Sequence, residues 1–343
     1  MSYERGSRAL RLEMTDQIPQ TEYISHRQFI MKVTGIDPED ETQSSQVGPA
    51  LARALDYDFI WSCYSRDWGL PRADMGRAKF YETETPWASH YEIETEEDVL
   101  KFDPVQAANL PTIEALTQDV RRHYDQSQAA YPEAVFPGGF YNSVFTWAIV
   151  TFGWERFMAA AMMDPDRFDR VMEGFFEITM MVVEAHIRAK VPIFLCHDDI
   201  VWASGPVFSP DWMRQYVFPR HKRMWAPLRE AGIQVLFCSD GNFDAFIDDL
   251  ADAGAGGFIF EPLTSLETIV ERYGRTHVII GNIDSRILQF KGPAEIRAEV
   301  RRCADLGRDC PGYFFAVGNH IPYTVPIPSI ECYLEAVEEY GNR

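Results

Sequence analysis

The chain has 343 residues, with 52 acidic against 32 basic side chains and a formal net charge of −20. This charge argues against a nucleic-acid ligand, because binding to phosphates needs clustered Lys and Arg, and it equally disfavours adhesion to anionic lipid. Hydrophobic residues make up 46% of the chain, which is enough for a sizeable core. No uncharged run approaches the roughly 20 apolar residues that a membrane-spanning helix needs.

The cysteines and the N-terminal residues indicate the cellular compartment in which the protein is expected. The six cysteines are scattered without any CxxC spacing, and residues 1–11 contain no apolar run of the kind found in secretory signals. In a chain of this length such cysteines do not indicate a disulfide framework. We therefore expect a cytoplasmic protein.

The residue pattern in the first half of the chain changes near residue 58. Residues 1–55 are mixed polar and are expected to form a helical lead-in. Short β-rich runs then predict strands at Phe59–Ser62 and Ala134–Phe136, separated in part by a hairpin-like alternation at 78–91. The helices predicted after these strands cover 145–163 and 166–189.

Beyond residue 190 short apolar runs alternate regularly with longer amphipathic ones. This order implies parallel strands joined by right-handed crossovers. With seven strands counted, a single (β/α)8 barrel over residues 1–343 with one strand missed is the most economical fold. An open doubly wound sheet is the alternative, but no GxGxxG follows the first strand. The later strand–helix pairs are 193–196 with 210–231, 234–237 with 243–253, 257–260 with 266–273, 277–280 with 293–306, and 313–317 with 329–340.

Polar side chains follow most of these strands. In a parallel barrel the residues just after each strand gather at one mouth, where active sites are built. A ring of His, Cys, Asp, Glu and Asn on an apolar scaffold therefore predicts an active site there. Its members are Ser62, Asp67, Gly138, Gly139, His197, Asp198, Asp199, Cys238, Ser239, Asp240, Glu261, Asn282, Asp284, Asn319 and His320.

Two of these strand ends leave alternatives open. Cys238 stands at the tip of an apolar strand, where it is either a reactive or metal-bound thiolate or a half-buried inert thiol. Cys196 lies inside its strand and is expected to be a small core hydrophobe. Asp198 and Asp199 are adjacent, so only one of them is expected to point into the mouth.

A metal site is a hypothesis for the mouth. Cys238, Asp240 and His320 offer thiolate, carboxylate and imidazole, which are the ligand types of zinc with one position left open. No HExxH or CxxC spacing supports this set, so a metal-free polar mouth is the alternative. Trp202 lies in the loop after His197 and either roofs the mouth or packs the loop down.

These residues together resemble the uroporphyrinogen decarboxylase superfamily. That resemblance implies a single (β/α)8 barrel, possible homodimers, and one of two activities: decarboxylation of porphyrinogens, or zinc-dependent methyl transfer in corrinoid demethylation pathways. The stretches that carry the resemblance are Gly138-Gly-Phe140 leading to Met163-Asp-Pro165, His197-Asp-Asp199 leading to Phe208-Ser-Pro210, Gly281-Asn-Ile-Asp284, and Gly318-Asn-His320-Ile-Pro322.

Compared with the decarboxylases, the match is partial. Asp67 stands at the spacing of their catalytic aspartate, which binds the pyrrole N–H groups, and His320 lies within one residue of their C-terminal histidine. Their N-terminal segment that grips substrate carboxylates with arginine has no counterpart, and the nearest stretch is Ser25-His-Arg27. A polycarboxylate tetrapyrrole is therefore not the expected substrate of a chain with this negative charge.

Compared with the methyltransferases, the ligand types are permuted. The strand that should end in His-x-Cys-Gly-Asn ends here in Cys238-Ser-Asp240-Gly-Asn242. The leading hypothesis is still methyl transfer with a corrinoid protein, in which a metal held by Cys238, Asp240 and His320 acts as Lewis acid. In this hypothesis His197 or Glu261 handles the proton.

The second hypothesis is a decarboxylase acting on a porphyrinogen-like or small aromatic acid. Asp67 would stabilise the protonated intermediate, and His320 or Tyr323 would orient the substrate. A barrel that only binds a ligand is the third. The residues predicted to bind substrate are Asp199, Trp202, Asn242, Asn282, Asp284, Asn319 and Tyr323.

Overall fold

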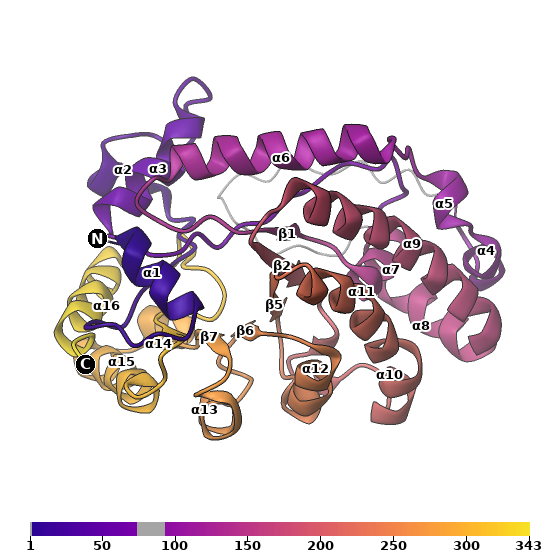
Figure 1. Cartoon of the computed structure of the whole chain (residues 1–343). Coiled ribbons are helices and arrows are strands. Elements are labelled where there is room, and N and C mark those ends of the chain that lie inside the picture. Colours follow the sequence, from indigo (N-terminus) through magenta and orange to yellow (C-terminus); the bar gives the residue numbers. More distant parts are fainter. Residues whose placement is uncertain (1, 74–92) are drawn as a thin grey trace.

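A computed structural model describes residues 2–73 and 93–343, so the hairpin-like alternation predicted at 78–91 lies outside the described residues. Helices surround a central set of parallel strands (Figure 1). Six of the strands are hydrogen-bonded in the order β1-β2-β5-β6-β7-β8. Their bounds are Gly138–Phe140 for β1, Ile193–His197 for β2, Gln234–Ser239 for β5, Gly257–Phe260 for β6, Val278–Ile280 for β7 and Tyr313–Phe314 for β8.

An extended stretch at residues 18–24 joins the open edge of β8. The Thr21 N–H donates to the carbonyl of Phe315 at 3.0 Å, and the Phe315 N–H donates to the carbonyl of Pro19 at 2.8 Å. A parallel bridge between Gln20 and Phe315 sets the register. This stretch is the strand that the sequence pattern missed, because it lies inside the region that was expected to be a helical lead-in.

A second extended stretch, residues 58–64, closes the remaining gap. The Asp58 N–H donates to the carbonyl of Gln20 at 2.9 Å, and the Val135 N–H donates to the carbonyl of Asp58 at 3.0 Å. A parallel bridge joins Phe59 to Val135, just before β1 begins. Eight parallel segments therefore form the (β/α)8 barrel that the alternation predicted.

The stretches predicted at 59–62 and 134–136 lie in the barrel, but they pair through isolated bridges, and the first full strand is β1, which begins at Gly138. Gly139 has a φ of +110°, and a Cβ at this residue would collide with the backbone of Leu195 in β2. Gly138 and Gly139, which were expected just after a strand, are needed because β1 and β2 approach so closely.

Two predicted helices are each divided. The helix predicted at 145–163 becomes α7 (Val144–Phe152) and α8 (Trp154–Met163), because Gly153 between them has a φ of +75°. The helix predicted at 210–231 becomes α10 (Pro210–Tyr216) and α11 (Phe218–Glu230), which begins with proline in its first turn.

Among the other elements, the helix predicted at 243–253 becomes a 3-10 helix at Asp244–Phe246 followed by an α-helix at Ile247–Ala253, and the long helix at Ile113–Ala130 was not predicted. Asp164 caps the helix that starts at Pro165, as its position before a proline suggests. No helix among the described residues is long and apolar enough to cross a membrane. The remaining elements are α1 (Ser2–Leu10), α2 (Arg27–Thr34), α3 (Ser44–Ala54), α4 (Glu96–Lys101), α5 (Pro104–Ala107), α6 (Ile113–Ala130), α9 (Pro165–Ala189), the hairpin strands β3 (Val201–Trp202) and β4 (Gly205–Pro206), the 3-10 helix η1 (Asp244–Phe246), α12 (Ile247–Ala253), α13 (Leu266–Tyr273), α14 (Ser285–Phe290), α15 (Pro293–Gly307) and α16 (Ile327–Tyr340).

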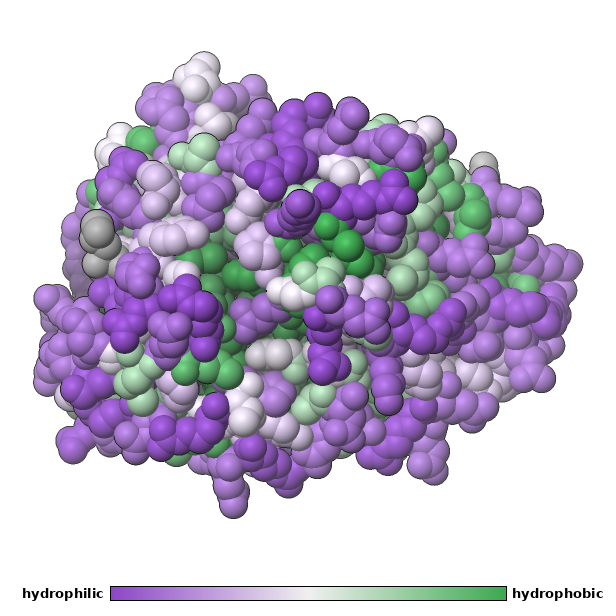
Figure 2. Space-filling view, viewed as in Figure 1, coloured by the Kyte–Doolittle hydropathy of each residue, from purple (hydrophilic) through white to green (hydrophobic). Residues whose placement is uncertain are grey.

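The core has an inner and an outer part, since successive side chains of a strand point to opposite faces. The outer part packs the barrel wall against the helices. Ala9 and Leu10 of α1 pack against the inner part. On the face shown in Figure 2, hydrophobic side chains gather in the middle and polar ones cover most of the rest. The inner part includes Phe59, Val135, Ile193, Leu195, Leu236, Cys238, Ile259, Val278, Ile280, Phe314 and Ala316.

Glu22 is a buried acid at the seam between residues 18–24 and β8. Its two carboxyl oxygens lie 3.1 and 3.2 Å from the Val317 N–H that donates to them, and the Tyr333 hydroxyl of α16 donates a short hydrogen bond to it. Burial raises the pKa of Glu22 to about 8, although these bonds oppose the change. Glu22 therefore holds a proton in the folded protein under conditions where the unfolded chain has released it.

This pKa predicts a pH-dependent stability. Because the folded-state pKa is raised, the stability contributed by Glu22 is fully present below its unfolded pKa and is lost as the pH rises through about 8. Replacing Glu22 with Gln removes this loss, which has a limiting slope of about 1.4 kcal/mol per pH unit. The Tm of Glu22→Gln minus the Tm of the wild type, both measured by calorimetry, should therefore increase as the pH rises from about 5 to about 8.

The exposed Glu13 is the control for this series. The hydrogen bond from Arg11 lowers the pKa of Glu13, so Glu13→Gln should show no such gain. A Tm difference between Glu22→Gln and the wild type that stays constant over the same pH range would contradict the raised pKa.

Candidate active site

His197, the last residue of β2, is nearly buried and held by Tyr141. Its Nδ1 lies 2.9 Å from the Tyr141 carbonyl oxygen, and the two rings stack with centroids 4.6 Å apart and planes 6° from parallel. A carbonyl only accepts, so Nδ1 carries a proton, and in the neutral ring Nε2 keeps a free lone pair. Nε2 lies 3.7 Å from Oδ1 of Asp199. The imidazole therefore presents its ligating nitrogen to a carboxylate.

Three side chains from two neighbouring strand ends meet at the mouth. Ligand atoms of His197, Asp199 and Asp240 all lie within 4.8 Å of one another, and we call these three residues the mouth cluster. The Asp240 N–H also donates to Asp199 Oδ1 at 2.9 Å. Within residues 2–73 and 93–343, this is the group of His, Cys, Asp and Glu side chains arranged closely enough to share one metal ion.

Negative charge accumulates around Asp240. Burial raises the pKa of Asp240 to about 7, and the charges of Asp199 and Glu261 add to the effect, while His197 and a hydrogen bond from Asn319 oppose it. Several carboxylates so close together repel one another, and a bound cation or a proton on Asp240 relieves the repulsion.

Glu261, the first residue after β6, borders the mouth cluster. Its Oε2 accepts a hydrogen bond from the Gly241 N–H at 2.7 Å, and its Oε1 accepts one from Asn319 Nδ2 at 2.8 Å. The positive charge of Arg286 interacts with Glu261, but this guanidinium is ion-paired with Asp284 at 2.7 Å. Glu261 thus joins the ends of β5, β6 and β8.

Asp198 points away from the mouth, as expected for one of the two adjacent aspartates. It is fully buried, and its Oδ2 lies 2.8 Å from Nε2 of His221 in α11. Asp199 is the one that faces the mouth. Cys196 is also fully buried, which agrees with its expected role in the core.

The predicted metal set of Cys238, Asp240 and His320 shares only Asp240 with the mouth cluster. Cys238 is 1% exposed and belongs to the inner core, where burial and the charges of Asp240 and Asp199 raise the pKa of its thiol well above its ordinary value. A thiol in these surroundings is protonated. His320 Nδ1 lies 2.7 Å from Asn319 Oδ1, and its ring meets the edge of Tyr23.

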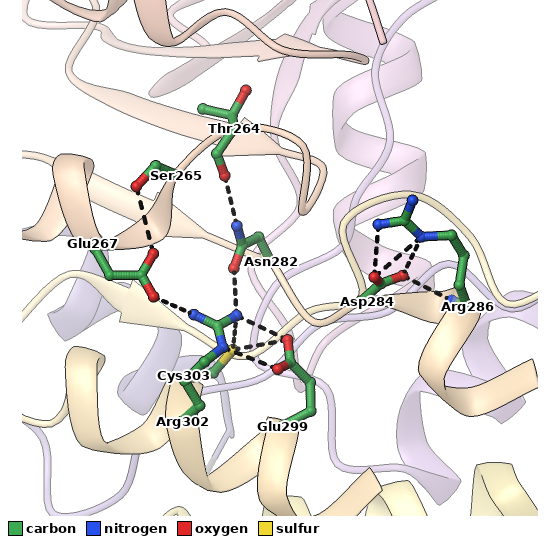
Figure 3. Close-up of polar contacts among 9 residues, drawn as sticks. All are labelled: Thr264, Ser265, Glu267, Asn282, Asp284, Arg286, Glu299, Arg302 and Cys303. Carbon is green, nitrogen blue, oxygen red and sulfur yellow. Dashed lines mark hydrogen bonds and ion pairs between the residues drawn. The ribbon is translucent and has the colours of Figure 1, made fainter. Parts of the chain in front are cut away.

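Asn282 and Asp284 were predicted to bind substrate, but both are engaged with protein groups (Figure 3). Asn282 is 2% exposed, donates to the Thr264 carbonyl at 2.8 Å, and accepts from Arg302 Nη2 at 3.4 Å. Arg302 also pairs with Glu299 at 2.8 Å. Asp284 caps α14 through the Arg286 N–H. These contacts anchor the end of β7 to the helices behind it.

The remaining predicted residues lie on loops after the strands. Asp67 is exposed, and its Oδ1 accepts a hydrogen bond from the Gly69 N–H at 2.9 Å. Trp202, 41% exposed on the β3–β4 hairpin, meets Trp154 edge to face, and its carbonyl accepts from the Asn242 N–H at 3.0 Å. Tyr323 is half-buried in the loop before α16. The hairpin therefore lies against the end of β5.

Tyr141 and Thr146 are site residues that the sequence prediction missed. Tyr141 stacks on His197, and Thr146 Oγ1 accepts a hydrogen bond from the Asp199 N–H at 2.7 Å. Tyr141 directly follows Gly-Gly-Phe, which is the tip of β1. Placing the strand at 134–136 instead hid this position.

Comparison with known proteins places this barrel in a family. The family model described as uroporphyrinogen decarboxylase (URO-D) matches residues 69–340. The chain belongs to the uroporphyrinogen decarboxylase family. Members of this family are enzymes, and both decarboxylases and methyltransferases are among the proteins that this chain resembles.

Individual relatives in the uroporphyrinogen decarboxylase family are distant. The chain is 30% identical over 164 residues to a uroporphyrinogen decarboxylase from Salinispora tropica, covering 48% of this chain and 43% of that protein. It is 26% identical over 178 residues to one from Pelobacter propionicus, covering 52% and 51%. The chain thus spans about half the length of the curated relatives it matches. Its fold matches a methyltransferase from Methanosarcina mazei with a TM-score of 0.67 and 18% identity, over 99% of this chain and 98% of the other.

Proposed function

We propose that this member of the uroporphyrinogen decarboxylase family is a methyltransferase that works with a corrinoid protein. It uses a divalent metal ion, for which zinc is the leading candidate. The observation that carries the proposal is the mouth cluster, in which His197, Asp199 and Asp240 converge within 4.8 Å. The match in fold to a methyltransferase over 99% of the chain supports the same reading.

The donor set fits a divalent ion. Imidazole and carboxylate ligands suit zinc and its first-row neighbours, and three protein ligands leave a position open for a substrate. The thiolate that zinc methyltransferases of this superfamily supply does not fit here, because Cys238 is buried in the inner core and does not belong to the mouth cluster. We therefore assign the metal to His197, Asp199 and Asp240 in place of the set with Cys238 and His320.

Different residues of the chain are proposed to bind the ion, to orient its ligands and to accept a proton. When bound, the ion supplies Lewis acidity to the group that gives or receives the methyl. Tyr141 orients His197 through its carbonyl, and Thr146 holds the backbone of Asp199. Glu261 stays outside the mouth cluster but next to it, so it is the carboxylate positioned to take the proton of the acceptor.

Decarboxylation is the second candidate, and one observation favours it. With a pKa of about 7, Asp240 is a carboxyl group that can hold a proton near neutral pH and donate it to the carbon that has lost carbon dioxide. Against it, Asp199 and Glu261 repel an anionic substrate. Arg27, the nearest match to the decarboxylases' arginine segment, pairs with Asp37 and Glu39 at 2.7 and 2.6 Å.

The metal assignment predicts which variants lose the ion. The purified wild type should contain about one zinc per chain, and His197→Ala and Asp240→Asn should lose it, because each removes a ligand. Cys238→Ala should keep it. The measurement is metal content by plasma mass spectrometry after equilibration with zinc and gel filtration.

Asp248→Asn is the matched control, since Asp248 is an exposed carboxylate of α12 paired with Arg272, and this variant should keep its zinc. If Cys238→Ala lost its zinc while His197→Ala kept it, the metal would be bound by the set that includes the Cys238 thiolate. The assignment of the metal to the mouth cluster would then be wrong.

The methyl-transfer proposal predicts a direct reaction with a methylated corrinoid. With zinc and a panel of thiol, phenol and amine acceptors, the protein should demethylate methylcobalamin, followed by its visible spectrum. Glu261→Gln should slow this reaction roughly 100-fold, in line with the loss of a general base. Carbon dioxide release from aromatic or pyrrolic acids, with no demethylation of the corrinoid, would instead establish the decarboxylase.

A further inference from the structure

The tip of β2 is held by hydrogen bonds to the segment that leads into α7. The Ser143 N–H donates to the carbonyl of His197 at 3.2 Å, and His197 Nδ1 donates to the carbonyl of Tyr141 at 2.9 Å. Thr146 Oγ1 accepts from the Asp199 N–H at 2.7 Å. The positions of His197 and Asp199 in the mouth cluster therefore depend on where this segment lies.

Asp198 fixes that segment from the other side of the strand. Its carboxylate is 0% exposed and accepts hydrogen bonds from the backbone N–H groups of Phe145 at 3.3 Å and Thr146 at 2.7 Å. Ser143, at the N-cap position of α7, makes no side-chain cap bond to the helix. Asp198 thus caps α7 from another element and adds a negative charge where the helix dipole favours it.

His221 holds Asp198 in this position. Its Nε2 lies 2.8 Å from Asp198 Oδ2, both side chains are 0% exposed, and the imidazole stacks on Trp225 at 4.8 Å with planes 3° apart. Asp198 Oδ2 also accepts from the Phe145 N–H and Oδ1 from the Thr146 N–H, so α7 and α11 hold the same carboxylate.

The cost of this arrangement suggests that it serves more than packing. His221 Nδ1 is buried and finds no hydrogen-bond partner within the described residues. A buried polar atom without a partner destabilises the fold, and an apolar side chain of similar size would avoid that penalty. The contact that an apolar side chain could not make is the bond to Asp198.

We propose that Asp198 and His221 are a positioning pair, which locks the start of α7 against the tip of β2 and thereby holds His197 and Asp199 at ligand distance. The consequence for metal binding rests on the proposed function. The consequence for the order of the β2 tip does not, because it follows from hydrogen bonds within the chain.

His186 provides a matched control. It is equally buried, at 1% exposure, and makes two hydrogen bonds, to the Val182 carbonyl at 2.7 Å and from the Gly139 N–H at 3.1 Å. It contacts β1 rather than the tip of β2. Replacing it tests what the loss of any buried imidazole does to this barrel.

The experiment compares His221→Leu, His221→Gln and His186→Leu with the wild type by two readouts. The first is the dissociation constant for Co²⁺, followed by its visible absorption. His221→Leu should bind Co²⁺ roughly 10- to 100-fold more weakly, the range typical of groups that orient metal ligands. His221→Gln, whose amide can still donate to Asp198, should recover most of that loss, and His186→Leu should bind within about twofold of the wild type.

The second readout is hydrogen exchange of the metal-free proteins. Peptides covering residues 141–147 and 196–202 should exchange at least about tenfold faster in His221→Leu than in the wild type, and at the wild-type rate in His186→Leu. If His221→Leu does not fold, Thr146→Val tests the link between the start of α7 and the tip of β2 that the pair is proposed to hold in place, since it removes the acceptor for the Asp199 N–H and should weaken Co²⁺ binding in the same range.

The outcomes separate the two claims. A wild type that binds no Co²⁺ overturns the metal proposal, and the exchange data then decide the positioning pair alone. Wild-type exchange at both peptides in His221→Leu overturns the pair. Equal weakening of Co²⁺ binding in His221→Leu and His186→Leu overturns it as well, because the effect would then belong to any buried imidazole.

Discussion

The alternation of side chains at the tip of β2 is the constraint on which the site depends. His197 and Asp199 face the mouth, and Asp198 between them faces the layer of helices, because successive side chains of a strand point to opposite faces. One short run thus supplies two members of the mouth cluster and the cap of α7. The positions of His197 and Asp199 are therefore linked to that of Asp198, which lies between them in the chain.

Charge is the second constraint, and it distinguishes this barrel from a site for anions. Asp199, Asp240 and Glu261 place like charges close together, and the pKa of Asp240 rises to about 7 as a result of burial and this repulsion. Such a site lowers its energy by taking up a cation or a proton. Both proposed reactions use this property, but decarboxylation brings an anionic substrate next to these carboxylates, whereas metal-assisted methyl transfer does not require one.

The barrel and its mouth were accessible from the sequence, because the alternation after residue 190 is local and regular. The strand at 18–24 was not, since its partner Phe315 lies almost 300 residues away and nothing near Gln20 signals the pairing. His197, Asp199 and Asp240 were each expected at the mouth, but their convergence depends on register between strands. Cys238 was placed one residue beyond its strand, whereas β5 continues to Ser239, so the thiol lies inside the wall.

The central claim is that the mouth cluster is a metal site, and anomalous X-ray diffraction of crystals grown with zinc tests it most directly. A single strong peak at the zinc edge, about 2.0–2.2 Å from His197 Nε2 and from carboxylate oxygens of Asp199 and Asp240, is the predicted result. A peak bound to Cys238 or His320, or a fully occupied mouth with water and no anomalous signal, would contradict it.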